Sequence, residues 1–381
     1  MSLHSLPAVF MRGGTSKAVM FQARDLPADR AAWDPIFLAA MGSPDPYGRQ
    51  LDGMGGGISS LSKICVLAPS ARNDADIDYT FAQVQIHVPT VDFKGNCGNM
   101  SSAVGPFAVD EGLVQPGGDA ATVRIFNTNT AKLIHASFPL LGGRTRYDGD
   151  LAIPGVAGTG APVKLDFLSP GGATTGKLLP TGKPLDRLEV PGLGTIEASM
   201  VDAANAAVFV RARDLGLTGI ELPGELEARP ELLERLAAIR IAASLAMGIA
   251  GSAEAARAIR TVPIIGFVAP PAEARTLSGE VLPAASYELA ARMISNGQPH
   301  RALPLTGSLC TAIAARIEGT LVAEALSPSA PASGPLRLGM PSGVLTVAAE
   351  VTRDAAGQWQ ALSGSFYRTC RRLFDGRIYL P

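Results

Sequence analysis

One arrangement occurs twice in this chain, and this repetition limits the possible folds more than any other feature. In each half, several short apolar segments typical of strands lead into an alanine-rich segment typical of a helix, residues 101–112 and residues 309–318. A cysteine lies near the start of each helix, Cys97 before the first and Cys310 within the second. The sequence therefore predicts a diverged internal duplication with a central helix in each half.

The boundary between the halves is expected in residues 171–184, a segment rich in glycine, threonine, lysine and proline that is typical of a linker. We therefore expect two domains, residues 1–183 and residues 184–381, that form a cleft where they face each other. A chain of 381 residues is too long for one ordinary hydrophobic core, and its 42 glycines and 29 prolines indicate many tight turns between short strands.

The composition indicates a folded chain that binds neither nucleic acid nor a membrane. Hydrophobic residues make up 47% of it and charged residues 18%, the reverse of the balance typical of disorder. The formal net charge is −1, so we expect no broad basic surface for nucleic acid. We expect no membrane span, because no apolar run reaches about 18 residues, and residues 1–10 lack a signal-peptide pattern.

The cysteines and histidines are too dispersed for a metal site or a disulfide framework. Four cysteines occur without a Cys-x-x-Cys pair, and the four histidines are equally scattered. We therefore expect no metal, and reduced thiols typical of a cytoplasmic protein. Three of the cysteines are interpreted as structural: Cys65, Cys310 and Cys370.

Cys97 is the strongest candidate for a reactive group. Free cysteines are usually small buried hydrophobes, but Cys97 lies between two Gly-Asn pairs in residues 95–99. Glycine lets a ligand approach the backbone and asparagine donates hydrogen bonds, and neither has much value around a core cysteine. Because the N–H groups at a helix start lack partners within the helix, this segment can also hold a carboxylate.

Lys63 is the second candidate, and two interpretations of it stay open. It lies near the start of an apolar segment, residues 62–67, after three consecutive glycines. One interpretation is a solvated charge at the edge of a sheet. The other is a lysine that points into the cleft and acts as a base.

Two glycine-containing turns offer groups that can bind an anion. Residues 12–17 form either a plain hairpin turn or a carboxylate cradle of hydroxyls and backbone amides, and they lack the P-loop spacing. The matching segment of the second half is residues 297–308, where His300 and Arg301 precede a helix start. Three arginines near the C-terminus are expected to form a surface or interface patch: Arg368, Arg371 and Arg372.

Several motifs resemble those of the PrpF family, in the expected order over nearly the whole chain. They are Met-Arg-Gly-Gly-Thr-Ser-Lys at residues 11–17, Met-Gly-Ser-Pro-Asp at 41–45, Asp-Gly-Met-Gly-Gly at 52–56, Ser-Lys at 62–63, Gly-Asn-Cys-Gly-Asn at 95–99, Val-Gly-Pro-Phe-Ala at 104–108, His-Arg-Ala at 300–302 and Arg-Thr-Cys-Arg-Arg-Leu at 368–373. This family includes 2-methylaconitate cis–trans isomerases, 3-methylitaconate Δ-isomerases and 4-oxalomesaconate tautomerases.

The resemblance implies an α+β, diaminopimelate-epimerase-like fold, with two similar domains, each a curled β-sheet around a central helix, and a site between them. In that fold the last strand can return to the first domain, here through residues 378–380. The resemblance also implies that Lys63 and Cys97 are the catalytic acid and base, with no metal, flavin or pyridoxal phosphate. The residues expected to contact the substrate are Thr15, Ser16, Asn96, Gly98, Asn99, Met100, His300, Arg301, Thr306, Gly307, Ser308 and Leu309.

We therefore expect a cofactor-independent isomerase that moves a proton in an unsaturated di- or tricarboxylate, similar to a 2-methylaconitate cis–trans isomerase. One alternative is a Δ-isomerase or tautomerase of methylitaconate or 4-oxalomesaconate. A second is an amino-acid or hydroxy-acid epimerase, which is disfavoured because Cys310 lacks the Asn-Cys-Gly-Asn context of Cys97. A third is a non-catalytic carboxylate-binding accessory protein. The expected partner is a small-molecule unsaturated polycarboxylate, and both a monomer and a homodimer stay open.

Overall fold

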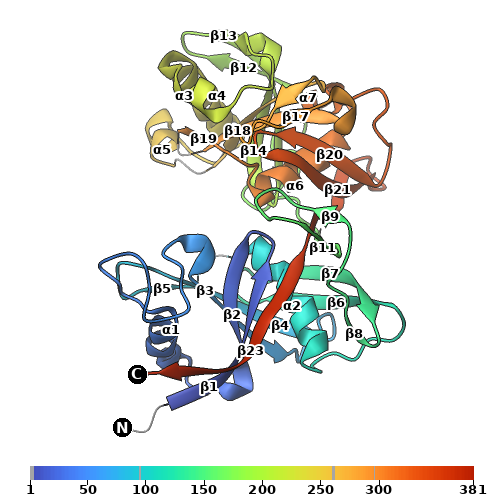
Figure 1. Ribbon diagram of the computed structural model, residues 1–381. Helices are drawn as coiled ribbons and strands as arrows, with labels where there is room; N and C mark the ends of the chain where they lie inside the picture. The colour runs from blue at the N-terminus through green and yellow to red at the C-terminus, as the bar shows by residue number, and fades with distance from the viewer. Residues whose placement is uncertain (1–3, 94–95, 260–261, 296) are drawn as a thin grey trace. The chain divides into compact units, whose positions relative to one another are not determined.

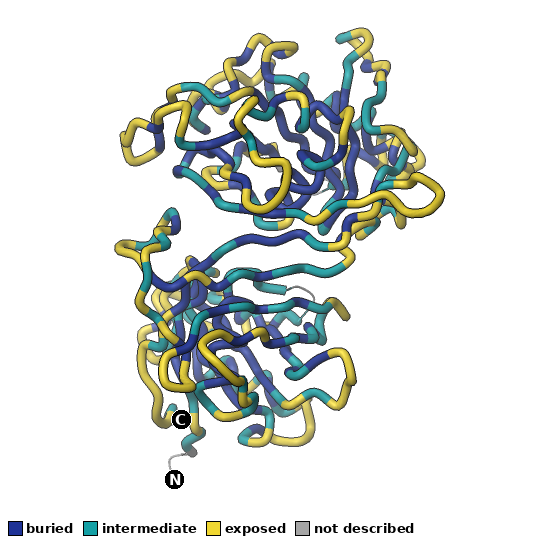
Figure 2. The backbone as a smooth tube through the Cα atoms, turned by 90° about the vertical axis from the view of Figure 1, so that its right-hand side faces the viewer, coloured by how far each residue is buried: buried dark blue, intermediate teal, exposed yellow. Residues whose placement is uncertain are grey.

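The chain folds into two compact units, each containing strands and helices. The computed structural model describes residues 4–93, 96–259, 262–295 and 297–381. The first unit comprises Met1–Phe167 with Tyr367–Pro381, and the second comprises Leu168–Phe366 (Figure 1). Buried positions concentrate in the central strands and helices of each unit, and exposed ones in the loops (Figure 2).

The first unit is built on one mixed sheet with the strand order β23–β1–β2–β3–β4–β6–β7. Neighbouring strands are antiparallel except for the parallel pairs β2–β3 and β4–β6. These strands are β1 (His4–Gly13), β2 (Ser16–Gln22), β3 (Lys63–Pro69), β4 (Ile77–Val84), β6 (Ala120–Asn127), β7 (Lys132–Leu141) and β23 (Cys370–Leu380). Shorter strands extend this unit: β5 (Val91–Asp92), β8 (Arg144–Thr145), β9 (Leu151–Ala152), β10 (Thr159–Gly160) and β11 (Val163–Leu168).

The helix α2 (Gly98–Asp110) forms the centre of this unit, and every residue from Met100 to Val109 is buried. It begins three residues earlier than the sequence pattern predicts, because the carbonyl of Cys97 already accepts a hydrogen bond from the N–H of Ser101 (2.9 Å). The helix lies so close to β7 that a Cβ at Gly105 would stand 2.7 Å from the Phe138 ring. Glycine is therefore the residue that permits this packing.

A second apolar cluster covers the face of the sheet opposite α2. The helix α1 (Trp33–Met41) packs Phe37 parallel to Phe21 of β2, with ring centroids 6.1 Å apart. The sequence predicts a longer helix over residues 25–41. In the structure, separate 3-10 turns precede α1, namely η1 (Ala23–Asp25) and η2 (Arg30–Ala32), because the chain leaves η1 in extended backbone at Leu26.

The second unit has its own mixed sheet in the order β12–β13–β14–β15–β18–β20–β21–β22, with parallel pairs β14–β15 and β18–β20. Its buried helix α6 (Leu305–Ala315) contacts β13, β14 and β21. The strands are β12 (Asp186–Val190), β13 (Gly194–Ala203), β14 (Asn205–Arg211), β15 (Ile264–Ala269), β16 (Ala274–Arg275), β17 (Val281–Leu282), β18 (Leu289–Ser295), β19 (Gln298–Pro299), β20 (Pro335–Met340), β21 (Gly343–Arg353) and β22 (Trp359–Arg368). The other helices are η4 (Ala212–Leu215), α3 (Pro223–Glu227), α4 (Pro230–Ala246), α5 (Ala253–Ala258), η5 (Ala284–Ser286) and α7 (Leu321–Glu324).

The two units share one topology. In the first, β1, β2, β3, β4, β6 and β7 are neighbours in an antiparallel, parallel, antiparallel, parallel, antiparallel series. In the second, β13, β14, β15, β18, β20 and β21 repeat this series. The buried helix enters at the same point, after the short strand β5 in one unit and after β19 in the other. This equivalence means that α2 and α6 can be compared position by position.

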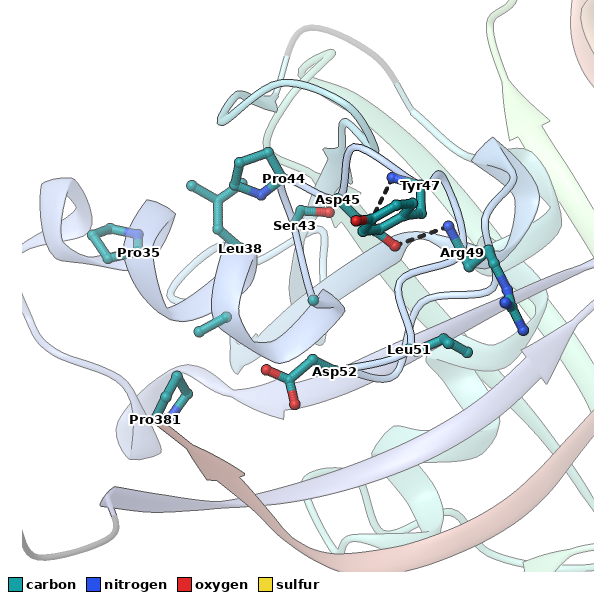
Figure 3. Close-up of a pocket in the computed structure, with 12 residues that line it drawn as sticks. Pro35, Leu38, Ser43, Pro44, Asp45, Tyr47, Arg49, Leu51, Asp52 and Pro381 are labelled. Atoms are coloured by element: carbon teal, nitrogen blue, oxygen red, sulfur yellow. Dashed lines mark hydrogen bonds between the residues drawn. The ribbon is translucent and has the colours of Figure 1, made fainter.

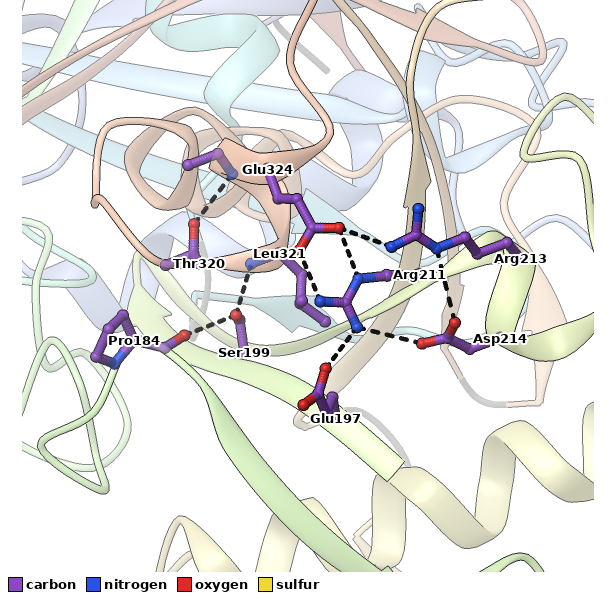
Figure 4. Close-up of polar contacts among 10 residues, drawn as sticks. Pro184, Glu197, Ser199, Arg211, Arg213, Asp214, Thr320, Leu321 and Glu324 are labelled. Atoms are coloured by element: carbon purple, nitrogen blue, oxygen red, sulfur yellow. Dashed lines mark hydrogen bonds and ion pairs between the residues drawn. The ribbon is translucent and has the colours of Figure 1, made fainter. Parts of the chain in front are cut away.

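An ion-pair cluster fixes α7 beside the sheet of the second unit (Figure 4). The Arg211 guanidinium contacts carboxylate oxygens of Glu324 at 2.6 Å and Glu197 at 2.8 Å. The Arg211 side chain is only 15% exposed, and these partners raise its pKa and lower that of Glu324. At the other end of α7, Ser199 Oγ accepts from the Leu321 N–H (2.9 Å).

Residues 171–184 belong to the second unit and are tied to it. The buried Asp202 accepts hydrogen bonds through Oδ2 from the N–H groups of Thr174 (2.8 Å) and Thr175 (2.5 Å) and from the Thr175 hydroxyl (2.9 Å). Gly171 forms an isolated bridge with Ala203. This glycine-rich segment therefore wraps around a carboxylate of the chain itself.

No helix in the described part of the chain is long and apolar enough to cross a membrane.

We expect Phe107→Ala to lower the free energy of unfolding by about 3–5 kcal/mol, because it leaves a cavity beneath the central helix. Phe107 is 1% exposed, whereas the control Phe374 is 48% exposed on β23. Urea unfolding followed by circular dichroism measures both variants. An equal or larger loss in Phe374→Ala would contradict the central place of α2.

Candidate functional site

Lys63 is the first residue of β3, and its side chain lies against the face of the β3–β4 pair. The residue is 8% exposed, so the interpretation as a solvated edge charge is wrong. Its Nζ donates to Gln83 Oε1 at 2.5 Å and lies 4.9 Å from the centroid of the Phe81 ring. An amine at this place is shielded from bulk water and held by a neutral acceptor.

Residues on the same face of β3 and β4 connect Lys63 to Cys97. Cys65 lies two positions along β3 from Lys63, and its thiol donates to the Tyr79 hydroxyl at 3.8 Å. Burial raises the pKa of the Cys65 thiol, the Cys97 thiol raises it further, and the Tyr79 hydrogen bond and the Lys63 ammonium oppose the rise. The Cys65 sulfur is thus within electrostatic range of both predicted catalytic groups.

Cys97 occupies the N-cap position of α2 with extended backbone and is partly exposed. Gly98, Asn99 and Met100 are the first three residues of the helix, and N–H groups at these positions have no partner within the helix. They carry partial positive charge and can bind a carboxylate. The Met100 side chain is buried, so only its backbone can serve a ligand.

Buried amides hold the segment that enters α2. Asn127, at the end of β6, is fully buried and donates through Nδ2 to Asn96 Oδ1 at 3.3 Å. Ser101 Oγ donates to the same oxygen at 3.4 Å and to the Cys97 carbonyl at 3.2 Å. Asn96 therefore positions the backbone beside the thiol. Gly95, the first residue of the cysteine motif, lies outside the described residues.

The turn between β1 and β2 packs directly on the start of α2. Gly14 has a φ of +53°, in the left-handed region that favours glycine, and a Cβ there would stand 2.3 Å from Asn99 Oδ1. The exposed Thr15 accepts a hydrogen bond from Asn99 Nδ2 at 3.1 Å. Ser16, the first residue of β2, is 3% exposed. The segment is thus a hairpin turn that presents a hydroxyl at the helix start, and its role as a carboxylate cradle stays a prediction.

Arg368 contacts the start of α2 in the first unit. The prediction that this arginine lies in a surface patch is wrong. The residue is 8% exposed, and its Nε donates to Asn99 Oδ1 at 3.1 Å. Burial lowers the pKa of Arg368 to about 10. The position is buried because β23 follows directly and pairs with β1, which brings this segment of the chain onto the hairpin turn. Arg371 is exposed and Arg372 is half-buried against Glu111 (2.7 Å).

The remaining predicted residues belong to the second unit, where α6 begins at Leu305 rather than at residue 309. The Pro304 carbonyl already accepts from the Ser308 N–H at 2.7 Å, and Pro304 has the fixed φ suited to a helix entry. The N–H groups without helical partners are therefore those of Leu305, Thr306 and Gly307. The side chains of Ser308 and Leu309 are buried in the unit.

His300 and Arg301 differ in their surroundings. His300 is half-buried, and burial lowers the pKa of its imidazole, which favours the neutral form. Arg301 is 68% exposed, with Nη1 3.7 Å from Glu227 Oε1. Thr306 is exposed and accepts from Asn205 Nδ2 at 3.5 Å.

The shared topology shows where the two halves differ chemically. Cys97 caps α2, whereas the equivalent cap of α6 is Pro304, which has no ionisable side chain. Cys310 lies inside α6, is fully buried and donates to the Val201 carbonyl at 3.4 Å. Because a thiol-based epimerase needs a reactive cysteine in each half, this difference weakens the epimerase alternative.

A cavity of about 880 Å³ lies apart from these residues, between α1 and the loop that follows it (Figure 3). Its lining includes Pro35, Tyr47, Asp52 and Pro381. The one carboxylate there with several partners, Asp45, accepts from the N–H groups of residues 47, 49 and 50 and so stabilises the loop itself. No predicted site residue lines this cavity.

Among the described residues, no group of three or more histidine, cysteine, aspartate or glutamate side chains is arranged to hold a metal ion. The polar groups around Cys97 are amides, hydroxyls and cations: Thr15, Asn96, Asn99 and Arg368. Such a set suits an anionic organic ligand.

The chain is similar over its whole length to proteins named as isomerases. The family model described as PrpF protein matches residues 3–381. A 2-methyl-aconitate isomerase of Shewanella oneidensis is 38% identical, covering 98% of this chain and 96% of that protein. A (4E)-oxalomesaconate Delta-isomerase of Novosphingobium sp. is 37% identical, covering 100% and 98%. A crystal structure of methylitaconate-delta-isomerase superimposes with a TM-score of 0.92 at 38% identity, covering 100% of this chain and 96% of that one.

Fold and similarity together define an α+β enzyme of the isomerase class, and the expected α+β fold with two similar units and the expected isomerase activity are confirmed. The chain belongs to the PrpF family.

Sequence reasoning missed three residues that hold the candidate groups: Gln83, Asn127 and Arg368. Gln83 lies 20 residues from Lys63, and only the register of the sheet reveals that the two are opposite each other. Asn127 lies 31 residues from Asn96, so local sequence patterns do not reveal their contact. Arg368 stands in one of the family motifs, which is a signal that could have marked it.

We expect iodoacetamide at about pH 8 to alkylate Cys97 before the other three cysteines. Burial raises the pKa of Cys65 and Cys310, and that of Cys370 to about 12, so little thiolate forms at these positions at that pH. Peptide mass spectrometry after brief exposure of the folded enzyme measures the order. Equal labelling of a buried cysteine in the folded enzyme would contradict this assignment.

Proposed function

We propose that this enzyme isomerises a small unsaturated di- or tricarboxylate by proton transfer, with Lys63 and Cys97 as the acid and base groups. One observation carries the proposal: the first unit places a shielded lysine at the start of β3 and a partly exposed thiol at the N-cap of its central helix, and both groups affect the pKa of the buried Cys65. Three helix N–H groups directly follow that thiol. A base, an acid and an anion-binding element are thus available within one unit.

The proposed reaction begins when the neutral amine of Lys63 removes a proton from a carbon next to the C=C bond. The C–H electron pair moves into the conjugated system, and the resulting dienolate spreads its negative charge onto a substrate carboxylate. Cys97 assists this step or returns a proton at the other end of the allylic system. The product has the same atoms as the substrate, so no other reactant is needed.

The start of α2 is suited to stabilise the dienolate. Its N–H groups at Gly98, Asn99 and Met100 supply donors whose positions do not change during the reaction, and Thr15 adds a hydroxyl. Losing one donor of this kind typically costs about 10²–10³ in rate. Ser16 and the second-unit residues His300, Arg301, Thr306, Gly307, Ser308 and Leu309 stay predictions as substrate contacts.

The position at which the proton returns decides the product. Return to the same carbon after bond rotation gives cis–trans isomerisation, as in the 2-methyl-aconitate isomerase that this chain resembles. Return two carbons away shifts the double bond, as the names of the methylitaconate and oxalomesaconate isomerases indicate. The similarity is almost equal for these classes, so the second outcome remains the alternative function.

We expect the purified enzyme to convert at least one of five acids: cis-aconitate, trans-aconitate, 2-methylaconitate, methylitaconate and 4-oxalomesaconate. Proton NMR in deuterium oxide follows the conversion, and solvent deuterium should enter the product because the amine exchanges its protons with solvent. A failure to convert any of the five would contradict the proposed function. Tight binding of an acid without turnover would instead favour a carboxylate-binding accessory protein.

We expect Lys63→Met to lower kcat by about 10²–10⁴-fold, which is the usual contribution of a positioned acid or base. Lys132→Met is the matched control, since Lys132 is exposed at the start of β7. Steady-state kinetics on the converted acid measure both variants, and circular dichroism verifies folding. A Lys63→Met enzyme with a near wild-type rate would remove this lysine from the mechanism.

A further inference from the structure

Gln83 has every hydrogen-bonding group of its amide engaged. Its Oε1 accepts from Lys63 Nζ at 2.5 Å, and its Nε2 donates to the carbonyls of Ser59 (3.0 Å) and Ser62 (2.9 Å). A flipped amide would lose both carbonyl contacts and turn an N–H group toward the lysine. The oxygen of Gln83 is therefore fixed toward Lys63.

One of the two carbonyls that orient Gln83, that of Ser62, is itself held by further hydrogen bonds. The two carbonyls belong to η3 (Ser59–Leu61) and the residue after it, directly before β3. The Ser62 carbonyl accepts from the Val84 N–H at 3.1 Å, and its hydroxyl donates to the Val84 carbonyl at 2.9 Å. The fully buried Gln50 donates to Ser62 Oγ at 2.7 Å. The Gln83 amide is therefore held by a segment that is itself hydrogen-bonded to β4.

This contact restricts the directions in which the lysine can exchange a proton. Lys63 and Gln83 are directly opposite each other in the β3–β4 register, and Nζ also lies over the Phe81 ring. An amine keeps N–H groups in both its neutral and its charged forms, so one N–H can stay on Gln83 Oε1 throughout. The lone pair of the neutral amine then does not point at Gln83 Oε1.

Gln83 itself adds no charge beside the amine. A carboxylate at this position would stabilise the ammonium and oppose its use as a base, whereas an amide oxygen is neutral. The described titratable groups on the elements packed around Lys63 are Cys65 on β3, Tyr79 on β4, Asp92 on β5 opposite Gln83, and Cys97 at the start of α2.

We infer that Gln83 is a positioning residue for the isomerase reaction, which aims Lys63 at the substrate and keeps the amine able to give up its proton. This inference rests on the proposed function of Lys63.

The kinetic test compares two substitutions of Gln83 with the same substitutions of Gln85, an exposed glutamine just beyond β4. Gln83→Met removes the acceptor and should lower kcat by about 10²-fold, as expected for a misplaced catalytic group, with KM nearly unchanged. Gln83→Glu should move the acidic limb of the kcat/KM profile upward by about 1–3 pH units. Gln85→Met and Gln85→Glu should behave like wild type, because solvent screens an exposed charge.

A second measurement does not depend on turnover. The enzyme is labelled with [6-¹³C]lysine, and the Lys63 signal is assigned by its absence from the Lys63→Met spectrum. Its titration midpoint should rise by about 1–3 pH units in Gln83→Glu and stay near that of wild type in Gln85→Glu. If no acid is converted but this shift occurs, the proposed reaction is wrong, whereas the predicted effect of the Gln83 contact on Lys63 is confirmed.

Two results would overturn the inference. One is a folded Gln83→Met enzyme that keeps wild-type kcat. The other is a Lys63 titration that does not differ between wild type and Gln83→Glu. Gln83→Met removes the acceptor of the Lys63 hydrogen bond, whereas Gln83→Glu removes the neutrality of the side chain. If one of the two variants fails to fold, the other therefore still tests the inference.

Discussion

The burial of α2 within the sheet of the first unit is the interaction on which the site depends. This packing fixes the helix axis, and the close approach at Gly105 leaves no room for it to slide along β7. The helix start is then fixed as well, together with the capping thiol and the hairpin turn at Gly14 that rests on it. A chemical group at the end of a fully buried helix is held more rigidly than one on a surface loop.

Comparison of the two units distinguishes the residues that the fold requires from those that could carry chemistry. Both units need a buried helix with many small residues, since only such a helix fits inside a curved sheet, and both have one. The caps are free to differ because they lie outside the core, and they do: Cys97 in one unit and Pro304 in the other. The thiol and the lysine are both found in the first unit.

Much of this organisation could be predicted from the sequence. The alternation of apolar segments and the two Ala-rich helices indicated the duplication, and the Gly-Asn pairs around Cys97 pointed to a helix start. The sequence pattern places the start of α6 four residues too late, at residue 309 and not at Leu305, because a proline next to glycine and histidine is typical of a turn. The burial of Arg368 was missed because it arises from the pairing of β23 with β1, a contact between opposite ends of the chain. Gln83 was missed because its meeting with Lys63 depends on strand register, which local patterns do not determine.

The return of β23 to the first unit also determines when each unit can complete its fold during synthesis. Residues 168–366 form a continuous segment, so the second unit can reach its native state as soon as that segment has left the ribosome. The first unit lacks a sheet strand until Cys370–Leu380 has been synthesised, although most of its residues precede those of the second unit. The buried arginine beside Asn99 arrives with the same late segment. Assembly of the candidate site is thus postponed until residues 370–380 have been synthesised, and an enzyme truncated before Cys370 would carry Lys63 and Cys97 on an unfinished sheet.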